Sequence, residues 1–588
     1  MYTKRLLTHE KTSHKCTVES QALVLGDCDC FVMKSKDNDQ TDALVAAGIG
    51  STFFRKGDND RSLRYYKRAH SIRRADNNPY SYIDTKLYTC IGTIHAQKGE
   101  TQLAIDNFKK TLSIRQQLFG MKGDLEAVAS CNNIGTVYYH KNDLLLALQW
   151  FQKALDILPG DDSTISLTIE SASNTSESES ERKKIDREYN AREAEINSHT
   201  SDGYESRKAE VTVKTYSNNG SIQYRLGQYD RAIEYYKFAL SIQKGDTNEP
   251  ITREKKERNY ASMASICCNI ANSHSQMGNR SKALEYHGGA LKMRQKVFGD
   301  NAETAASLHS IGNEYFQVKE YDKALSAYLS ALETRKRVLE ENHPDIAATG
   351  SSIGCVMCQQ GNYIEAVEYF REAIKIQEAG LLRDSSLAKM YGNAGTALKK
   401  AGNYDAALEN YENAYDIQKE LLGSDCHPSL CSIIMHIGSV HCKRGAHEDA
   451  LQYFTKCNMI LNVEEVHDSA ASATSQSSSI SAKLYNHFAT TYSEIGDYEE
   501  AATYYTKKLS IQEITLGLIH EDTAKTYHNI GRTYESKGTN EDFDKALNYY
   551  KLCFASRKSQ FGIFDRRTMN AGVQIARMWI VQCKPHSK

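Results

Sequence analysis

Few side chains in this chain are spaced so that they could do chemistry. Cys355 and Cys358 form a C-x-x-C pair, which is the spacing of a zinc hook or of a redox dithiol. A structural zinc site takes four ligands, normally from two such hooks, and no second pair follows nearby in the sequence. Cys28 and Cys30 are equally isolated, and the 19 histidines include no H-E-x-x-H grouping. The sequence therefore predicts no metal site and no cofactor.

Charge and hydropathy weigh against two classes of partner. Lys+Arg (73) and Asp+Glu (74) nearly cancel, whereas a nucleic-acid-binding surface normally brings a basic excess. No stretch approaches the ~18 consecutive apolar residues that a membrane-spanning helix needs. The N-terminal MYTKRLLTHEKTSHKC lacks the apolar core of a secretory signal; its basic start also fits a transit peptide, an alternative that Glu10 disfavours. We expect neither nucleic-acid binding nor membrane insertion, and the 15 dispersed cysteines favour a reducing, cytoplasmic location.

One phrase recurs eleven times along the chain, an isoleucine-glycine pair or a variant of it. Its second residue, called the small position here, is the origin for counting within each repeat. The small position is occupied by Gly50, Gly92, Gly135, Gly220, Ala271, Gly312, Gly354, Gly395, Gly438, Ala489 and Gly531. A second glycine follows at +7, except where Asn142 and Lys319 stand. Alanine recurs at +12 and an aromatic residue at +16, apart from Ser62 and His287 and a three-residue delay in the last copy.

Each of these columns predicts a feature of an antiparallel helix pair. Glycine inside a helix costs about 1 kcal/mol relative to alanine, so the close approach of a neighbouring helix must offset it. The glycine at +7 falls where a helix ends in a left-handed residue. The alanine and the aromatic residue are four apart, on one face of a second helix. Because one pair cannot bury its own apolar face, the pairs must stack into an array.

The pattern in GSIQYRLGQYDRAIEYYKFALSI resembles the tetratricopeptide repeat, which is usually 34 residues long. The longer period here, and the connectors His343-Pro344-Asp345 and His427-Pro428, are similar to the kinesin light chain and nephrocystin-3 subclass. The resemblance covers about residues 43–558. It implies an all-α superhelical solenoid of about eleven tetratricopeptide-type helix pairs, closed by a C-terminal capping helix.

Breaks in the pattern divide the chain into seven segments. The predicted segments are a poorly ordered N-terminal part (1–42), repeats 1–3 (43–158), a Ser/Glu-rich disordered insertion (159–209), repeats 4–9 (210–461), a loop insertion (462–480), repeats 10–11 (481–558), and a capping helix with a tail (559–588). The parts outside the repeats are too short to build a core of their own. With no P-loop, dinucleotide fingerprint or nucleophile elbow either, the sequence predicts that the chain is not an enzyme.

The resemblance implies that the first helix of each pair lines a concave groove that holds a partner protein. From the register, positions +1 and +4 face this groove. The expected lining comprises Tyr139, Tyr224, Asn272, Ser275, Asn313, Phe316, Cys355, Thr396, Lys399, Ser439, Cys442, Thr490 and Arg532. This lining is mostly polar with some aromatic residues, which suits an extended peptide or a helix held by hydrogen bonds.

The leading functional hypothesis is a protein-binding scaffold or adapter. A narrower version, implied by the resemblance, is a cytoskeleton-associated cargo adapter like kinesin light chain. A hypothesis of another class is a signalling component that phosphorylation of the SNTSESESE stretch would regulate through added negative charge.

Overall fold

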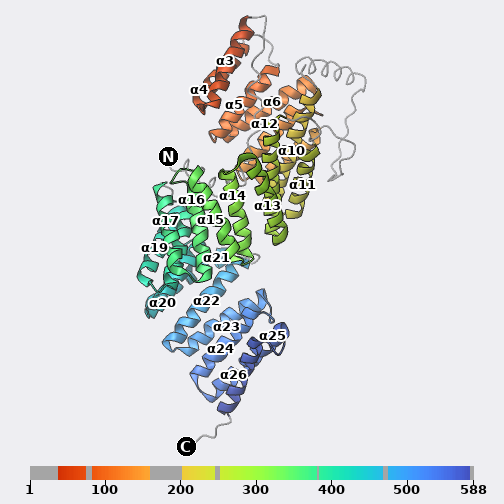
Figure 1. The fold of residues 1–588 in the computed structure, drawn as a ribbon. Helices are drawn as coiled ribbons and strands as arrows, with labels where there is room; N and C mark the ends of the chain where they lie inside the picture. The colour runs from red at the N-terminus through yellow and green to blue at the C-terminus, as the bar shows by residue number, and fades with distance from the viewer. Residues whose placement is uncertain are drawn as a thin grey trace, which may run out of the picture. The chain divides into compact units, whose positions relative to one another are not determined.

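A computed structural model describes residues 38–74, 82–158, 201–245, 252–380, 383–467 and 475–582. Within these ranges the chain consists of helices and the turns that join them, and contains no strand (Figure 1). The chain divides into two compact units, Met1–Thr334 and Arg335–Lys588. In each unit, consecutive helices pack as antiparallel pairs (Figure 1), so the predicted all-α helix-pair fold is confirmed.

Six helix pairs begin in unit 1. They are α3 (Asn38–Arg55) with α4 (Asn59–Arg74), α5 (Tyr82–Gln97) with α6 (Thr101–Phe119), α7 (Leu125–His140) with α8 (Leu144–Ile157), α10 (Ser201–Arg225) with α11 (Tyr229–Gly245), α12 (Arg253–Gln276) with α13 (Arg280–Phe298), and α14 (Ala302–Gln317) with α15 (Tyr321–Val338), whose last residues belong to unit 2.

Five further pairs and a final helix lie in unit 2. They are α16 (Pro344–Gln360) with α17 (Tyr363–Ala379), α18 (Ser385–Lys400) with α19 (Tyr404–Leu422), α20 (Cys431–Lys443), preceded by the 3-10 turn η2 (Pro428–Leu430), with α21 (His447–His467), α22 (Ser475–Ile495) with α23 (Tyr498–Thr515), α24 (Glu521–Lys537) with α25 (Asn540–Phe561), and α26 (Arg566–Gln582). Among the described helices, none is both long and apolar enough to cross a bilayer.

Two predicted segment boundaries differ from the structure. Helix α10 begins at Ser201, inside the predicted insertion, and is anchored to α7 by an ion pair of 2.7 Å between Arg207 and Glu126. Helices α21 and α22 extend to His467 and from Ser475, so much of the predicted loop 462–480 is helical. In both cases the helix extends through polar residues, whereas the predicted boundary was placed where the apolar pattern ends. Residues 1–37, 159–200 and 468–474 lie outside the described residues.

The close approach of a neighbouring helix that is expected at the small position is made by an aromatic ring of the second helix. A Cβ placed on Gly135 would lie 2.5 Å from Cε1 of Phe151, and one on Gly354 would lie 2.9 Å from Cε1 of Phe370. Both rings are fully buried. The aromatic residue of the second helix thus occupies the space that a Cβ on the first helix would take. In seven other repeats, a Cβ placed on the glycine would lie 2.6–3.2 Å from the nearest atom of the aromatic ring: Gly50, Gly92, Gly220, Gly312, Gly395, Gly438 and Gly531.

The turn after each first helix requires a left-handed residue. The nine glycines at +7 have φ between 76° and 94°. Asn142 and Lys319, which replace glycine in this column, adopt the same conformation with φ of 66° and 64°. The prediction of a left-handed residue at the helix end is therefore confirmed even where the residue type departs from glycine.

The histidine-containing connectors act as helix caps. Nδ1 of His343 accepts a hydrogen bond from the backbone N–H of Asp345, at 3.1 Å, while Pro344 occupies the first turn of α16. His427 and His520 cap η2 and α24 in the same way. An N-cap acceptor followed by proline suits the start of a helix, where backbone N–H groups lack partners. These connectors therefore fix where the next first helix begins.

A buried arginine near the end of the second helix ties one repeat to the next. Arg115 donates from Nε and Nη2 to the two carboxylate oxygens of Asp124, at 2.6 and 2.7 Å. Asp124 in turn caps α7 by accepting from the N–H groups of Glu126 and Ala127. Arg115 stands at position +23 of its repeat. The same position holds Arg73, Arg294 and Arg335, and it holds a glutamine in two other repeats, Gln377 and Gln512, and each of these side chains also hydrogen-bonds the next first helix or its cap. This contact was not predicted from the sequence.

The last helix covers the end of the array, as predicted. Ala571 and Met578 of α26 are fully buried, and α26 packs against α25. Its opposite face carries the exposed apolar side chains Met569, Val573 and Ile580.

Replacing Arg115 with alanine tests the inter-repeat tie. Arg115→Ala leaves the Asp124 carboxylate buried without its cation, so we expect the free energy of unfolding to fall by about 3–5 kcal/mol. Chemical denaturation followed by circular dichroism measures the change. Gln116→Ala, an exposed neighbour on the same helix, is the control and should change it by less than about 0.5 kcal/mol. Equal stability of the two variants would contradict the role given to Arg115.

Candidate partner-binding surfaces

The residues at +1 serve the repeat itself before they serve a partner. The Tyr328 hydroxyl donates to Oδ1 of Asn313 at 2.6 Å, and the Thr396 and Tyr411 hydroxyls are 2.9 Å apart. The ring at +16 is a tyrosine in these repeats, and the +1 side chain provides the hydrogen-bond partner that its buried hydroxyl needs. Asn313 and Thr396, both expected in the groove, are thus partly committed to the core of their own repeats.

The aromatic residues at +4 pack against the start of the second helix. The ring of Tyr224 lies 5.4 Å from that of Tyr229, and Phe316 lies 5.8 Å from Tyr321, both edge to face. Tyr139 is only 7% exposed, because it packs in a core cluster with Arg225 lying 4.9 Å over its ring. The expectation that Tyr139 lines an open groove is therefore corrected.

The other expected groove residues lie on the surface to different degrees. Ser275 accepts a hydrogen bond from Arg280, which also forms an ion pair of 3.1 Å with Glu314. Asn272 is half-buried, and Arg532 is exposed.

Two half-buried cysteines form the C-x-x-C pair. Burial, together with Cys358, raises the pKa of the Cys355 thiol to about 11, and burial also raises the pKa of Cys358. Cys355 Sγ accepts a hydrogen bond from Asn393 at 3.5 Å. Both sulfurs are therefore thiols at neutral pH, which suits packing better than redox or metal chemistry.

A basic cluster lies on three consecutive first helices of unit 2 and on the second helix α23. It comprises Lys399 (α18), His436 and Ser439 (α20), His487 (α22) and Lys508 (α23). Lys399 Nζ donates to Ser439 Oγ across the two repeats, at 3.4 Å. Burial, with Lys400 and Lys443 nearby, lowers the pKa of Lys399. Among the described residues, Lys399 forms no ion pair.

The two histidines of the basic cluster are neutral at pH 7. Burial and the charge of Lys399 lower the pKa of His436 to about 4, and burial with Lys399 and Lys508 does the same for His487. His436 stacks on Tyr411 and His487 on Phe454, with ring centroids 5.3 and 5.2 Å apart. The core aromatic residue of each preceding repeat thus supports an imidazole that can offer a hydrogen bond.

In unit 1, a polar cleft of about 290 Å³ lies between α10, α11 and α12. Its hydroxyl and amide side chains include Ser217, Asn218, Ser221 and Asn269. Lys214 also lines the cleft, and burial lowers its pKa to about 8. Side chains of this kind can hydrogen-bond an extended backbone.

The position two residues before the small position also faces these surfaces, and it was not predicted from the sequence. Asn218 and Asn269 in the polar cleft, and His436 and His487 in the basic cluster, all stand there. The signal was present in the sequence as a column of asparagine and histidine residues. Helical geometry places position −2 beside +1 and +5 on one face, so a groove assigned from +1 and +4 alone is incomplete.

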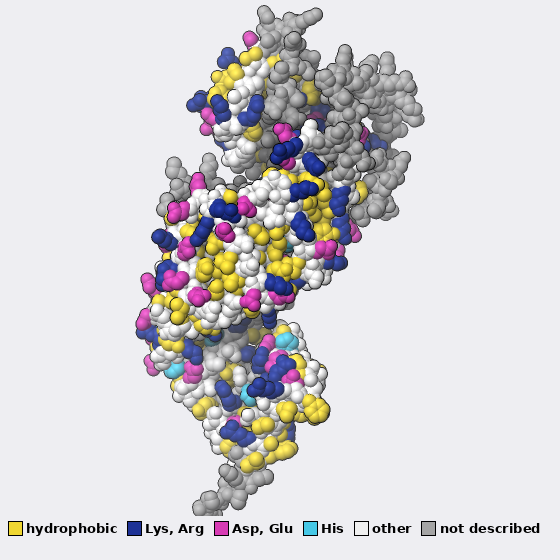
Figure 2. Space-filling model, in the orientation of Figure 1, with side chains coloured by type: hydrophobic (Ala, Val, Ile, Leu, Met, Phe, Trp, Pro, Cys, Tyr) yellow, Lys and Arg dark blue, Asp and Glu magenta, His cyan; other side chains and the backbone are white. Residues whose placement is uncertain are grey.

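Acidic and basic side chains are interspersed on the described surface of each unit, as Figure 2 shows for one face. The basic cluster is thus a local feature of a chain with a formal net charge of −1.

Comparison with family models decides the assignment. A tetratricopeptide repeat model matches residues 82–160, 261–335, 311–379, 386–457 and 480–559, and a second one matches 213–246. These matches span more than half of the chain. The chain belongs to the tetratricopeptide repeat family. The first tetratricopeptide pair, α3 with α4, precedes the matched ranges and is recognised by the contact between Gly50 and Tyr66.

Several solved tetratricopeptide and related structures are similar in fold. The apo form of RapI is 13% identical and covers 72% of this chain and 98% of its own, with a TM-score of 0.47. BtubC (BKLC) from P. vanneervenii is 18% identical over 42% of this chain and 94% of its own, with a TM-score of 0.34. A putative kinesin light chain from Podosopora anserina is 19% identical and covers 35% of this chain and 95% of its own, with a TM-score of 0.32. No match was found among the curated proteins.

The link between Thr396 and Tyr411 can be tested by removing either partner. Thr396→Val leaves the buried Tyr411 hydroxyl without this partner, so we expect a loss of about 1–3 kcal/mol in the free energy of unfolding. Adding Tyr411→Phe should recover most of that loss, because the pair then matches repeats that carry phenylalanine. Denaturation of the two single variants and the double variant measures this. A double variant no more stable than Thr396→Val would contradict the assignment.

Proposed function

We propose that this protein is a non-enzymatic scaffold or adapter that holds segments of partner proteins on the first helices of its repeats. Tetratricopeptide arrays expose extended surfaces of this kind and bind through them. The polar cleft of unit 1 and the basic cluster of unit 2 support two binding surfaces of different chemistry. A cytoplasmic location is part of the proposal, since no disulfide joins the described cysteines.

The basic cluster favours an acidic segment as its partner. Lys399 is half-buried and lacks an ion-pair partner among the described residues, and Lys400 and Lys443 disfavour its charge further. A partly desolvated cation without a counter-charge is costly, and a carboxylate from a partner would offset that cost. The neutral His436 and His487 would add hydrogen bonds beside it. The half-buried Lys399, which has no ion-pair partner among the described residues, is the observation on which the proposal rests.

A cargo adapter in the manner of kinesin light chain is a narrower form of the proposal. Its support is the set of histidine connectors, and these cap helices, so they describe repeat geometry more than partner choice. The alternative of regulation by phosphorylation depends on residues 171–181, which lie outside the described residues.

A peptide selection with two adjacent lysine variants tests the acidic-partner proposal. Peptides selected from a random library on the full chain should be rich in Asp and Glu and should bind more weakly as salt increases. Lys399→Ala should weaken the selected peptides roughly tenfold or more, because it removes a desolvated charge from the pair. The control Lys400→Ala, which changes the exposed neighbour, should leave affinity within about twofold. Selected peptides without acidic residues, or equal losses in both variants, would sink the proposal.

A further inference from the structure

The repeat register brings three positions together at two of the junctions between neighbouring repeats. They are +4 and +9 of one repeat and +5 of the next. In repeats 4 and 5 these are Tyr224, Tyr229 and Gln276: the two rings are 5.4 Å apart, and Gln276 hydrogen-bonds the Tyr224 hydroxyl. Tyrosine is the most frequent residue at +9, where it opens the second helix in five repeats, at Tyr229, Tyr321, Tyr363, Tyr404 and Tyr498.

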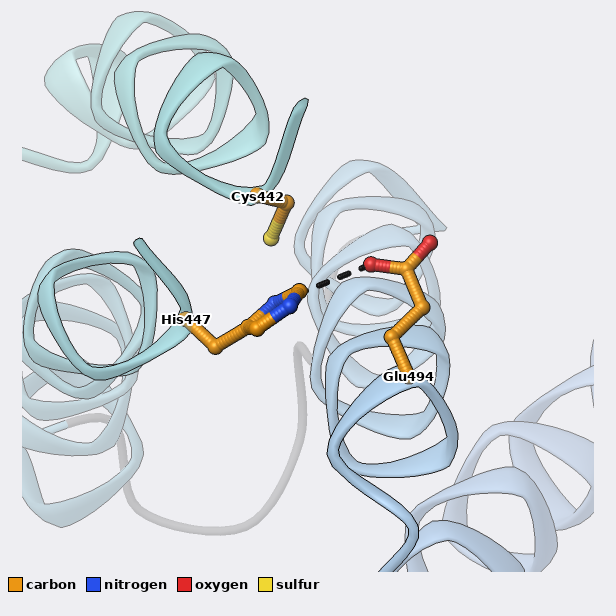
Figure 3. A group of neighbouring side chains, drawn as sticks. All are labelled: Cys442, His447 and Glu494. Carbon is orange, nitrogen blue, oxygen red and sulfur yellow. Dashed lines mark ion pairs between the residues drawn. The ribbon is translucent and has the colours of Figure 1, made fainter. Parts of the chain in front are cut away.

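At the junction of repeats 9 and 10, the same three positions hold a different set of side chains. Cys442 (+4) is near the end of α20, His447 (+9) opens α21, and Glu494 (+5) is in the last turn of α22. Figure 3 shows the three side chains pointing toward one another from three helices. One ligand atom of each lies within 4.8 Å of the other two. His447 Nδ1 is 3.8 Å from the Glu494 carboxylate.

Two further observations indicate that these groups suit a ligand. His447 Nδ1 is buried and has no hydrogen-bond partner among the described residues, although it faces the carboxylate. A buried ring nitrogen without a partner can take up a proton or bind a metal ion. Cys442 Sγ lies 3.0 Å from the Thr491 hydroxyl, which can donate to a thiolate and hold it in place.

We propose that Cys442, His447 and Glu494 bind one Zn²⁺ ion, with a water molecule as the fourth ligand. One sulfur, one imidazole nitrogen and one carboxylate oxygen form a donor set that zinc accepts readily. Tetrahedral zinc places its ligand atoms about 3.5 Å apart, so the side chains must close in by about 1 Å. Glu494 can make this movement, since its side chain is 47% exposed.

Zinc binding balances charge and protons at this junction. The Cys442 thiol loses its proton to solvent when the S–Zn bond forms. The thiolate and the Glu494 carboxylate then neutralise the two positive charges of the ion. The ion would link α20, α21 and α22, and so would join repeat 9 to repeat 10 within unit 2.

The chain provides a matched control at another junction. Cys358 is the +4 residue of repeat 7 and is half-buried, like Cys442. The +9 position there is Tyr363, and the +5 position of the next repeat is Lys400. Neither side chain would complete a zinc site with Cys358. If the three-residue set determines binding, a single cysteine at +4 is insufficient.

Titration of the purified full chain with Co²⁺ and then Zn²⁺ tests the proposal. We expect one Co²⁺ per chain, a sulfur-to-cobalt charge-transfer band, visible absorption typical of tetrahedral cobalt, and displacement by one Zn²⁺. Cys442→Ser should abolish the charge-transfer band. His447→Asn and Glu494→Gln should each weaken Zn²⁺ binding by roughly tenfold or more, since even an outer-sphere change costs that much. Cys358→Ser should bind like the unmodified chain.

Thermal unfolding supplies an independent measurement. Zn²⁺ should raise the melting temperature of the unmodified chain and of Cys358→Ser, and at the same Zn²⁺ concentration should raise that of Glu494→Gln by clearly less. Glu494→Gln changes a surface carboxylate, so its fold should be retained and circular dichroism can confirm this. Absence of stoichiometric binding, retention of the charge-transfer band in Cys442→Ser, or its loss in Cys358→Ser would each overturn the proposal.

Discussion

Nine of the eleven repeats depend on one contact, the aromatic ring of the second helix in the space that a Cβ on the first helix would occupy. At Gly354 the ring of Phe370 approaches that space to 2.9 Å, and the same geometry recurs along both units. Glycine in a helix costs about 1 kcal/mol, and the buried ring offsets that cost through its contacts. In repeat 5 the small position is Ala271, and the opposing side chain is the smaller His287, which is also buried. The helix pair, its turn and the stacking of pairs all follow from keeping this contact.

The sequence predicted the helix pairs because each column marks a steric requirement within about 20 residues. The turn needs a left-handed residue, and Asn142 and Lys319 adopt this conformation where other repeats have glycine. The distance from the small position to the turn is therefore the same in these repeats. Contacts between repeats were harder to predict. The partner of Arg115 is an aspartate that caps the next helix, while Gln377 makes the equivalent contact in another repeat. Changing residue types hid this column, and the burial of Tyr139 depends on Arg225, far away in the chain.

The register also explains how one scaffold carries surfaces of different chemistry. Positions −2, +1, +4 and +9 recur in every repeat, but the side chains there are free to differ once the small position and the ring are in place. Polar residues make a cleft in unit 1, Lys399 and two histidines make a basic cluster in unit 2, and Cys442 with His447 and Glu494 form a cluster of potential metal ligands. Binding residues could therefore be located from the sequence only as columns, and their partners had to come from the structure.

A double-mutant cycle at Gly354 and Phe370 tests the central contact most directly. If the ring fills the missing Cβ space, Gly354→Ala alone should lower the free energy of unfolding by about 1–3 kcal/mol, through overpacking. Phe370→Leu should make room for the added methyl group, so the double variant should be more stable than the sum of the single changes by about 1 kcal/mol. Purely additive changes would show that the glycine and the ring do not share that space, and would contradict the account.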